Sequence, residues 1–433
     1  MNLREISASD TIGTRLLPVA VIREQRLYLD RFCRDGPGSP FLPAYVQQVG
    51  GHYLATTPVF PALLAVPVYV VPVMLLEVDV RLVNLLSKLS GSLFAALSVA
   101  VLYLALRPLG SESGALGGAL AYAFGTSTWS VSSQGLWGHG PAQLFLAAAL
   151  YWAVRGEEAP RYRAGLGLAA GLMFASRPQT TGLVGLALVA HALYADRRWG
   201  LRCGVVFAGV VLAVFGYNLA AFGSIQGGYA RLNVAYMPIF KVPGMWSTPL
   251  LQGLLGLLVS PSRGLLVYSP ILLFAFAGIL LSVRRGERPL CRFLAAGFTA
   301  SLLTLSAYSF WWGGHSFGPR LLVDFLPVLA VFLAVAWPKV ERRPVLQVVW
   351  MLLFAASVGV QLVGALYYPS PHAVDWNKSP VDIDLARDRL WDWSDTQLGR
   401  LLRNGPPAVG FDNWPSRVCG PWRASSVAVP ESG

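Results

Sequence analysis

Long apolar stretches recur along this chain, and they constrain its fold more than any other feature. A transmembrane helix needs about 20 mostly apolar residues, because the hydrocarbon core of a bilayer is about 30 Å thick. The sequence therefore predicts an all-α polytopic membrane protein, a multi-span helical bundle. The stretches long enough to span, each bounded by Gly, Pro or charge, are 88–106, 114–132, 138–154, 201–222, 265–283, 290–310, 321–337 and 345–366.

Composition supports this prediction and excludes a nucleic-acid partner. The 433 residues are 55% hydrophobic and only 13% charged, whereas about a quarter of the residues in a typical soluble domain are charged. The net charge of +12 could indicate nucleic-acid binding. However, the Arg residues form short clusters between apolar stretches rather than one basic face, which is typical of signals that set membrane topology.

The apolar stretch from 164 to 194 is longer than one span, and Ser176-Arg177-Pro178 interrupts it. Proline removes a backbone donor and breaks a helix. The sequence thus predicts two short helices with Arg177 at the turn, which brings the predicted total to about ten spans.

Basic residues in short loops predict the orientation, since cytoplasmic loops are enriched in Lys and Arg. If ten spans alternate, all the basic clusters fall on one side, predicted to be cytoplasmic. The opposite, external side then receives SSQGLWGHG, the turn at Arg177, the segment 217–263, WWGGHSFGPR and the tail from Tyr367. The clusters are Arg107; Arg155, Arg161 and Arg163; Arg197, Arg198 and Arg202; Arg284, Arg285, Arg288 and Arg292; and Lys339, Arg342 and Arg343.

One apolar run determines on which side of the membrane the N-terminal region lies. It is PVFPALLAVPVYVVPVMLLEV, which begins at Pro58. Its prolines at 58, 61, 67 and 72 disfavour one straight helix, so we expect a juxtamembrane or re-entrant hairpin. Residues 1–57 are then external; a complete crossing would make them cytoplasmic. The predicted parts are an external first loop with juxtamembrane or re-entrant helices (1–87), a transmembrane bundle (88–366) and an external C-terminal tail (367–433).

The cysteines do not indicate metal or redox chemistry. Cys33, Cys203, Cys291 and Cys419 are far apart and fit no zinc or CxxC spacing. No metal site is predicted from them. Cys33 and Cys419 both fall on the predicted external side, where a disulfide is chemically allowed.

Seven segments, spread in order over almost the whole chain, carry motifs that are weak singly and specific together. They are Asp10-Thr11 with Thr14-Arg15-Leu16-Leu17-Pro18, Leu29-Asp30-Arg31-Phe32, GGHYLATTPVFPALLAVPVY, YAFGTSTWSVSSQGLWGHGPA, Arg177-Pro178, SPSRGLLVYSP and WWGGHSFGPRLLVDFLP. Together they resemble the bacterial phospholipid-carrier-dependent glycosyltransferases of the GT-C superfamily, a group related to protein O-mannosyltransferases and lipid A aminoarabinose transferases. The motifs specify the superfamily rather than the sugar.

The resemblance implies that an acidic residue of the first external loop is the catalytic base and that a polyprenyl-phosphate sugar is the donor. Asp10 is the matching position. A fixed carboxylate can remove the proton of an attacking acceptor hydroxyl, and backside attack inverts the anomeric carbon without a covalent intermediate. The leaving phosphate needs cationic or hydrogen-bonding partners, for which the predicted residues are Arg15, His52, His139, Arg177 and Arg320.

The chain departs from the family pattern at two places. Family members usually have a transmembrane helix before the acidic loop, whereas nine residues precede Asp10. They also often carry a Lys where this chain has Thr56; His52 and Arg15 are the candidates to supply the missing charge.

Further residues are predicted to line the pocket, and each has a plainer alternative. Arg320 and Asp324 lie one helical turn apart and could simply pair with each other. His139 could cap a helix, Arg177 could satisfy carbonyls freed at its helix break, and the tryptophans could anchor at the membrane interface. The predicted lining residues are Asp30, Trp137, Tyr229, Arg263, Trp312, His315 and Asp324.

The sequence thus predicts an inverting, polyprenyl-phosphate-sugar-dependent glycosyltransferase of a bacterial plasma (inner) membrane. Its active site faces the periplasm or exterior, among membrane lipids, and its acceptor is a cell-envelope glycan, lipid or protein. No cofactor is required by the pattern, although a divalent cation stays open. The alternatives are a polar-lipid transporter, which should show a midplane site and repeat symmetry, and a catalytically inactive GT-C-like scaffold.

Overall fold

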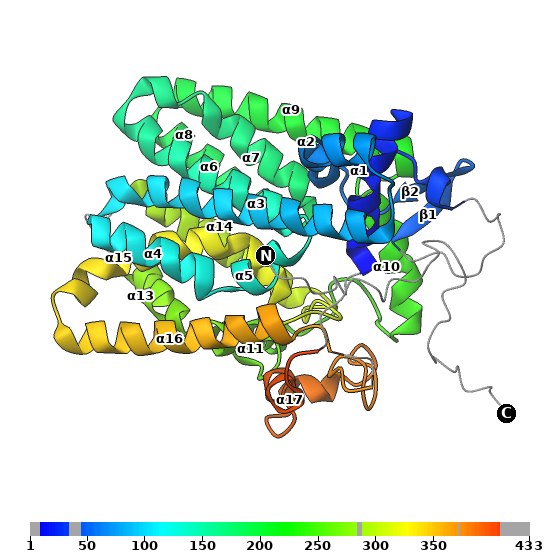
Figure 1. The fold of residues 1–433 in the computed structure, drawn as a ribbon. Helices are drawn as coiled ribbons and strands as arrows, with labels where there is room; N and C mark the ends of the chain where they lie inside the picture. The colour runs from blue at the N-terminus through cyan, green and yellow to red at the C-terminus, as the bar shows by residue number, and fades with distance from the viewer. Residues whose placement is uncertain (1–8, 34–44, 284–287, 371–372, 408–433) are drawn as a thin grey trace.

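The computed structural model describes residues 9–33, 45–283, 288–370 and 373–407 (Figure 1). The described chain is almost entirely helical, with one two-stranded antiparallel hairpin, so the predicted all-α class is confirmed. Cys33 takes part in a disulfide, and its predicted partner Cys419 lies outside the described residues, as do Arg284 and Arg285 of one basic cluster.

The N-terminal part forms a small layer at one end of the molecule. Its helix α1 packs against α2 and also contacts β2 of the hairpin, whose strands β1 and β2 pair with Val46 opposite Ala55. Gly50 and Gly51, at φ +59° and +86°, permit the tight turn between the strands. The elements are α1 (Ile12–Glu24), β1 (Val46–Val49), β2 (His52–Ala55) and α2 (Phe60–Leu75), with 3-10 helices at Ser9–Thr11 and Asp30–Phe32.

Three of the four prolines lie in one helix, α2, and Pro58 precedes it, so this run forms a single helix rather than a hairpin. Pro61 lies in the first turn of α2, where its missing donor costs little, while Pro67 and Pro72 lie inside the helix. At 16 residues and about 1.5 Å per residue, α2 is shorter than a bilayer core. One side of α2, with Ala62, Tyr69 and Val73, is buried, and Val71 and Met74 are exposed. A short helix with one buried and one exposed apolar side is typical of a juxtamembrane helix.

The remaining helices build the bundle, and a helix stands at each predicted span. They are α3 (Val80–Leu106), α4 (Glu112–Phe124), α5 (Ser127–Ser130), α6 (His139–Glu158), α7 (Gly165–Ser176), α8 (Pro178–Ala195), α9 (Arg197–Phe222), α10 (Gly228–Ile239), α11 (Leu250–Val259), α12 (Leu265–Tyr268), α13 (Leu273–Ser282), α14 (Pro289–Ala307), α15 (Leu326–Glu341), α16 (Pro344–Tyr367) and α17 (Gln397–Asn404). Short 3-10 helices lie at Arg107–Leu109, Ser132–Gln134, Pro160–Tyr162, Pro270–Leu272, Arg320–Phe325 and Arg387–Trp391.

Within the described residues, 5 helical segments are long and apolar enough to cross a membrane: Val80–Leu109, Arg197–Phe222, Pro289–Ala307, Arg320–Glu341 and Pro344–Tyr367. The chain is therefore a multi-pass membrane protein, while the number of about ten complete crossings stays a prediction. The break between α7 and α8 falls at Arg177, as predicted.

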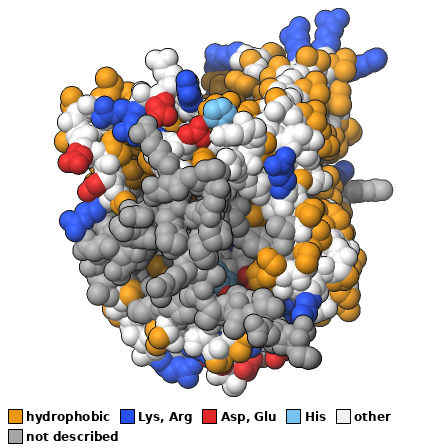
Figure 2. Space-filling model, turned by 90° about the vertical axis from the view of Figure 1, so that its right-hand side faces the viewer, with side chains coloured by type: hydrophobic (Ala, Val, Ile, Leu, Met, Phe, Trp, Pro, Cys, Tyr) orange, Lys and Arg blue, Asp and Glu red, His pale blue; other side chains and the backbone are white. Residues whose placement is uncertain are grey.

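Burial separates a central helix from lipid-facing ones. α15 packs against α4, α6, α13, α14 and α16, and most of its residues are buried. By contrast, few apolar side chains of α9 are buried, and several, including Val205 and Leu212, are exposed, as a helix bathed in lipid can be. Figure 2 shows hydrophobic side chains along much of the right-hand margin of the end view.

The predicted cytoplasmic and external loops gather at opposite ends of the bundle. The turns after α8 and α15 lie at the left in Figure 1, whereas α1, the hairpin and α10 lie at the right. At the right-hand end, the α1 hydroxyl of Thr14 donates to the Leu136 carbonyl at 2.8 Å. At the other end the basic loops contact one another: Arg163 with Asp196, Arg288 with the Pro108 carbonyl and Ser113 with Glu341.

Candidate active site

A cavity between the N-terminal layer and the bundle collects several of the predicted site residues. Asp10 and Thr14 come from the start of the chain, Trp137 and Arg177 from turns of the bundle, and Arg320 from the 3-10 helix before α15. The complete lining is Asp10, Thr11, Thr14, Thr57, Pro58, Pro61, Trp137, Gly138, Arg177, Tyr229 and Arg320. Five predicted residues, Asp10, Trp137, Arg177, Tyr229 and Arg320, therefore meet here.

Asp10 and Arg320 form the central ion pair of this cavity. The Arg320 Nη2 donates to Asp10 Oδ2, and the guanidinium lies 4.4 Å from the centroid of the Trp137 ring. Asp10 Oδ1 and Arg320 Nε are buried and have no hydrogen-bond partner among the described residues. A buried polar atom without a partner is costly, so both atoms are available to a bound molecule.

Asp324 lies behind the cavity and does not pair with Arg320, contrary to the plainer alternative. Its Oδ1 is 2.7 Å from His139 Nδ1, and its Oδ2 accepts from Arg177 Nε at 3.2 Å and from the Thr180 hydroxyl at 2.5 Å. All of these groups are buried. The network fixes the orientation of Arg177, which is the member of the set that reaches the cavity.

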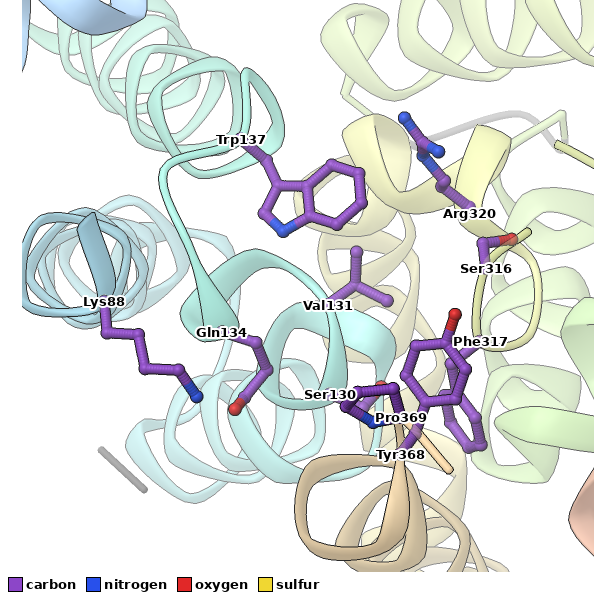
Figure 3. A pocket seen from close by; sticks show the side chains of 10 residues that line it. All are labelled: Lys88, Ser130, Val131, Gln134, Trp137, Ser316, Phe317, Arg320, Tyr368 and Pro369. Carbon is purple, nitrogen blue, oxygen red and sulfur yellow. The ribbon is translucent and has the colours of Figure 1, made fainter. Parts of the chain in front are cut away.

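A second cavity shares Trp137 and Arg320 with the first, and Figure 3 shows its lining. Lys88 of α3 extends toward Gln134 at one side, Arg320 lies at the other side, and Trp137 lies between them. Lys88 is 1% exposed, and a Lys inside a spanning helix is expensive and typically functional. The lining is Lys88, Ser130, Val131, Gln134, Trp137, Ser316, Phe317, Arg320, Tyr368 and Pro369.

Both cavities are small. They hold about 40 Å³ and about 20 Å³ of space for water-sized molecules, while one water needs about 10–15 Å³. Each cavity as it stands holds no more than a few waters. Arg320, which is held by an ion pair, and Trp137 line both cavities.

Two of the predicted phosphate ligands lie away from both cavities. Arg15 is buried and donates to Asn84 Oδ1 at 2.8 Å, so it ties α1 to α3. His52 Nδ1 lies 2.6 Å from Asp30 Oδ2, and Tyr28 stacks on its ring with centroids 4.1 Å apart. The pair links β2 to the 3-10 helix at Asp30–Phe32. Asp30, which was predicted to line the pocket, therefore lies in this contact and not in a cavity wall.

Arg263 and Trp312 also serve packing rather than a cavity wall. Arg263 is fully buried and donates to the carbonyls of Trp312 and Gly314 at 3.0 and 3.1 Å. It donates to Asn377 Oδ1 at 2.6 Å, so it joins the loop before α15 to the C-terminal segment. Trp312 is 1% exposed and belongs to the main core cluster.

His315 lies with two aspartates that sequence reasoning missed. Its Nε2 is 2.9 Å from Asp382 Oδ1 and 3.7 Å from Asp384 Oδ2. Burial alone would lower the pKa of His315, but the hydrogen bond to Asp382 and the charge of Asp384 raise it. Two aspartates separated by one residue, Asp382 and Asp384, were the available sequence signal. Only the fold shows that they lie beside His315, nearly 70 positions earlier in the chain.

Lys88 is the other residue that sequence reasoning missed. It is the first residue of the predicted span 88–106, whereas α3 begins at Val80, so its charge lies inside the helix, where a Lys is costly and typically functional. A charge at the edge of the apolar stretch was the available signal. It, rather than His52 or Arg15, lies beside a cavity that Arg320 also lines.

Residues 58–221 match the family model described as "Dolichyl-phosphate-mannose-protein mannosyltransferase". The match confirms the resemblance to GT-C glycosyltransferases and supports a membrane glycosyltransferase of the mannosyltransferase type. It runs from α2 to the end of α9, so it includes Lys88, Trp137 and Arg177 but neither Asp10 nor Arg320. No curated protein matches the chain.

Proposed function

We propose that the protein transfers a sugar from a polyprenyl-phosphate donor to a cell-envelope acceptor, with Asp10 as general base. The observation that carries the proposal is the carboxylate of Asp10: one oxygen is paired with Arg320, and the other is buried at the cavity wall without a partner among the described residues. The acceptor is a glycan, lipid or protein, and the membrane is a bacterial plasma membrane with this end of the bundle outside.

The reaction requires one carboxylate. The acceptor hydroxyl oxygen attacks the anomeric carbon from the face opposite the phosphate and forms the new glycosidic bond. The bond between the anomeric carbon and the phosphate oxygen breaks, and its electron pair leaves with the polyprenyl phosphate. Asp10 takes the hydroxyl proton, a contribution of typically 10²–10⁴ in rate. A single displacement of this kind inverts the anomeric centre.

Three cationic side chains near Asp10 are placed to bind the leaving phosphate and neutralise its charge. Arg320 and Arg177 line the cavity with Asp10, and Lys88 lines the neighbouring cavity with Arg320. In the absence of donor, the Asp10 carboxylate takes the position on Arg320 that a phosphate oxygen would take. Donor binding then draws Arg320 away and leaves Asp10 ready to accept a proton, because guanidinium binds phosphate oxygens strongly.

Asp10→Asn tests the proposal, because the amide keeps the shape of the carboxylate but cannot accept the proton. Purified variant should transfer sugar from a polyprenyl-phosphate mannose donor roughly 10²–10⁴-fold more slowly than wild type, while donor binding is retained. The matched control is Asp30→Asn, an aspartate of the same N-terminal layer that pairs with His52 away from both cavities. Turnover by Asp10→Asn within about threefold of wild type would show that Asp10 is not the base.

A further inference from the structure

His315, Asp382 and Asp384 form a compact group of side chains that can ligate a metal, outside both cavities. One nitrogen and two carboxylate oxygens, one from each residue, lie within 4.8 Å of one another. Zinc binds such atoms at about 2.0–2.2 Å. Ligands at tetrahedral or octahedral angles around one ion are then about 3.0–3.5 Å apart. His315 Nε2 lies 2.9 and 3.7 Å from the two carboxylates, and the two carboxylate oxygens, at most 4.8 Å apart, draw together when both bind the ion.

The two segments that carry these residues are held together independently of the three side chains. Arg263 donates both to the Gly314 carbonyl, beside His315, and to Asn377 in the C-terminal segment. Ile383, between the two aspartates, is completely buried in the main core cluster. The ligand-bearing segments are thus fixed on the bundle, which reduces the entropic cost of assembling a site from distant parts of the chain.

Neighbouring groups orient the two carboxylates. The Trp312 indole N–H donates to Asp384 Oδ1 at 2.7 Å, which leaves Asp384 Oδ2 toward His315. The backbone N–H of Asp384 donates to Asp382 Oδ1 at 2.9 Å. Hydrogen bonds that fix the ligands in this way are a regular part of metal sites.

Charge and access also suit a cation. His315 is the only basic ion-pair partner of either aspartate in the described part of the chain, so two carboxylates face one imidazole. The side chains of His315, Asp382 and Asp384 are 33%, 31% and 15% exposed, and an ion can therefore reach them from solvent.

We propose that His315, Asp382 and Asp384 bind one divalent cation of the zinc type. The mixture of one imidazole and two carboxylates favours Zn²⁺ over Mg²⁺ or Ca²⁺, which prefer all-oxygen sites. Three protein ligands leave a coordination position open to water. Because His315 directly precedes Ser316 and Phe317 of the cavity wall, the ion fastens that wall to the C-terminal segment.

Metal binding is measured directly, without reference to sugar transfer. Full-length protein with a histidine-free affinity tag is stripped with a chelator, dialysed and titrated with ZnCl₂ by calorimetry, and its zinc content is counted by elemental analysis. We expect one Zn²⁺ per chain in wild type. Asp382→Asn should bind at least tenfold more weakly, since even outer partners of metal ligands change affinity by about 10–100-fold.

The matched control is Asp392→Asn, which changes an exposed aspartate of the same segment whose carboxylate accepts from the backbone N–H and hydroxyl of Ser394, and it should bind zinc as wild type does. Zinc should raise the melting temperature of wild type and Asp392→Asn but not that of Asp382→Asn or His315→Ala. Equal zinc binding by wild type and His315→Ala, or binding of Mg²⁺ in preference to Zn²⁺, would overturn the assignment. A variant that is unfolded without metal is replaced by Asp384→Asn, to which the same criteria apply.

Discussion

The two ends of the bundle hold their charges in different ways. At the end with the basic loops, Arg163 and Asp196 pair through side chains that are 28% and 36% exposed. At the cavity end, His139 and Asp324 are completely buried and share their network with Arg177. Exposed pairs contribute little to stability, whereas a buried charge that loses its partner is strongly destabilising. Loss of a charge should therefore matter little at the basic end and much at the cavity end.

A second contrast lies within the cavity end itself, between its two buried aspartates. Both oxygens of Asp324 have partners, but only one oxygen of Asp10 has one among the described residues. The satisfied carboxylate is suited to positioning, and the incompletely satisfied one to chemistry. The predictions below separate these roles.

The largest effect on stability is expected for Asp324→Ala. Removing this carboxylate leaves Arg177 buried without its charge partner, which should cost about 3–5 kcal/mol. Unfolding in mixed micelles with increasing SDS measures the loss. A variant as stable as wild type would contradict the assignment of a buried, geometry-fixing network to this end.

A smaller effect, on donor affinity, is expected for Arg320→Ala. A hydrogen bond to a charged group contributes about 1.5–3 kcal/mol, so binding of polyprenyl phosphate should weaken roughly ten- to hundredfold. Arg320→Lys keeps the charge but loses the planar guanidinium. Its affinity for polyprenyl phosphate should therefore lie between those of wild type and Arg320→Ala. Unchanged lipid binding in both variants would exclude Arg320 from the phosphate site.

Lys88→Met should weaken binding of polyprenyl phosphate by a smaller factor than Arg320→Ala, about three- to tenfold. Lys binds phosphate as a point charge, without the bidentate geometry of Arg. Methionine fills a similar volume and inserts readily into a spanning helix. Titration of a fluorescent polyprenyl phosphate into purified protein measures the change. If the variant binds as tightly as wild type, the second cavity does not contact the phosphate.

The smallest effect is expected at the basic end. Arg163→Ala removes the half-exposed pair with Asp196 and a hydrogen bond to the Gly156 carbonyl. It should cost only about 1 kcal/mol of stability, because such pairs contribute little, and should leave sugar transfer unchanged. A loss comparable to that of Asp324→Ala would abolish the proposed distinction between the two ends.

The sequence by itself determined the helical membrane class, the break at Arg177 and the separation of the basic loops from the remaining loops. These features follow from apolar length, proline chemistry and charge counts, which are local properties. It also pointed to Asp10 and Arg320 individually, through the resemblance, without indicating that they pair.

Only the tertiary structure decided the partners. Asp324 bonds to His139, 185 positions away, rather than to Arg320 one turn away, because the 3-10 geometry of Arg320–Phe325 directs the two side chains to different neighbours. Arg15 and His52 make packing contacts away from the cavities, Lys88 reaches a cavity from within a spanning helix, and His315 meets Asp382 across the fold. Contacts between distant segments depend on how helices pack, and the period or composition of one segment does not encode which side chain of another will face it.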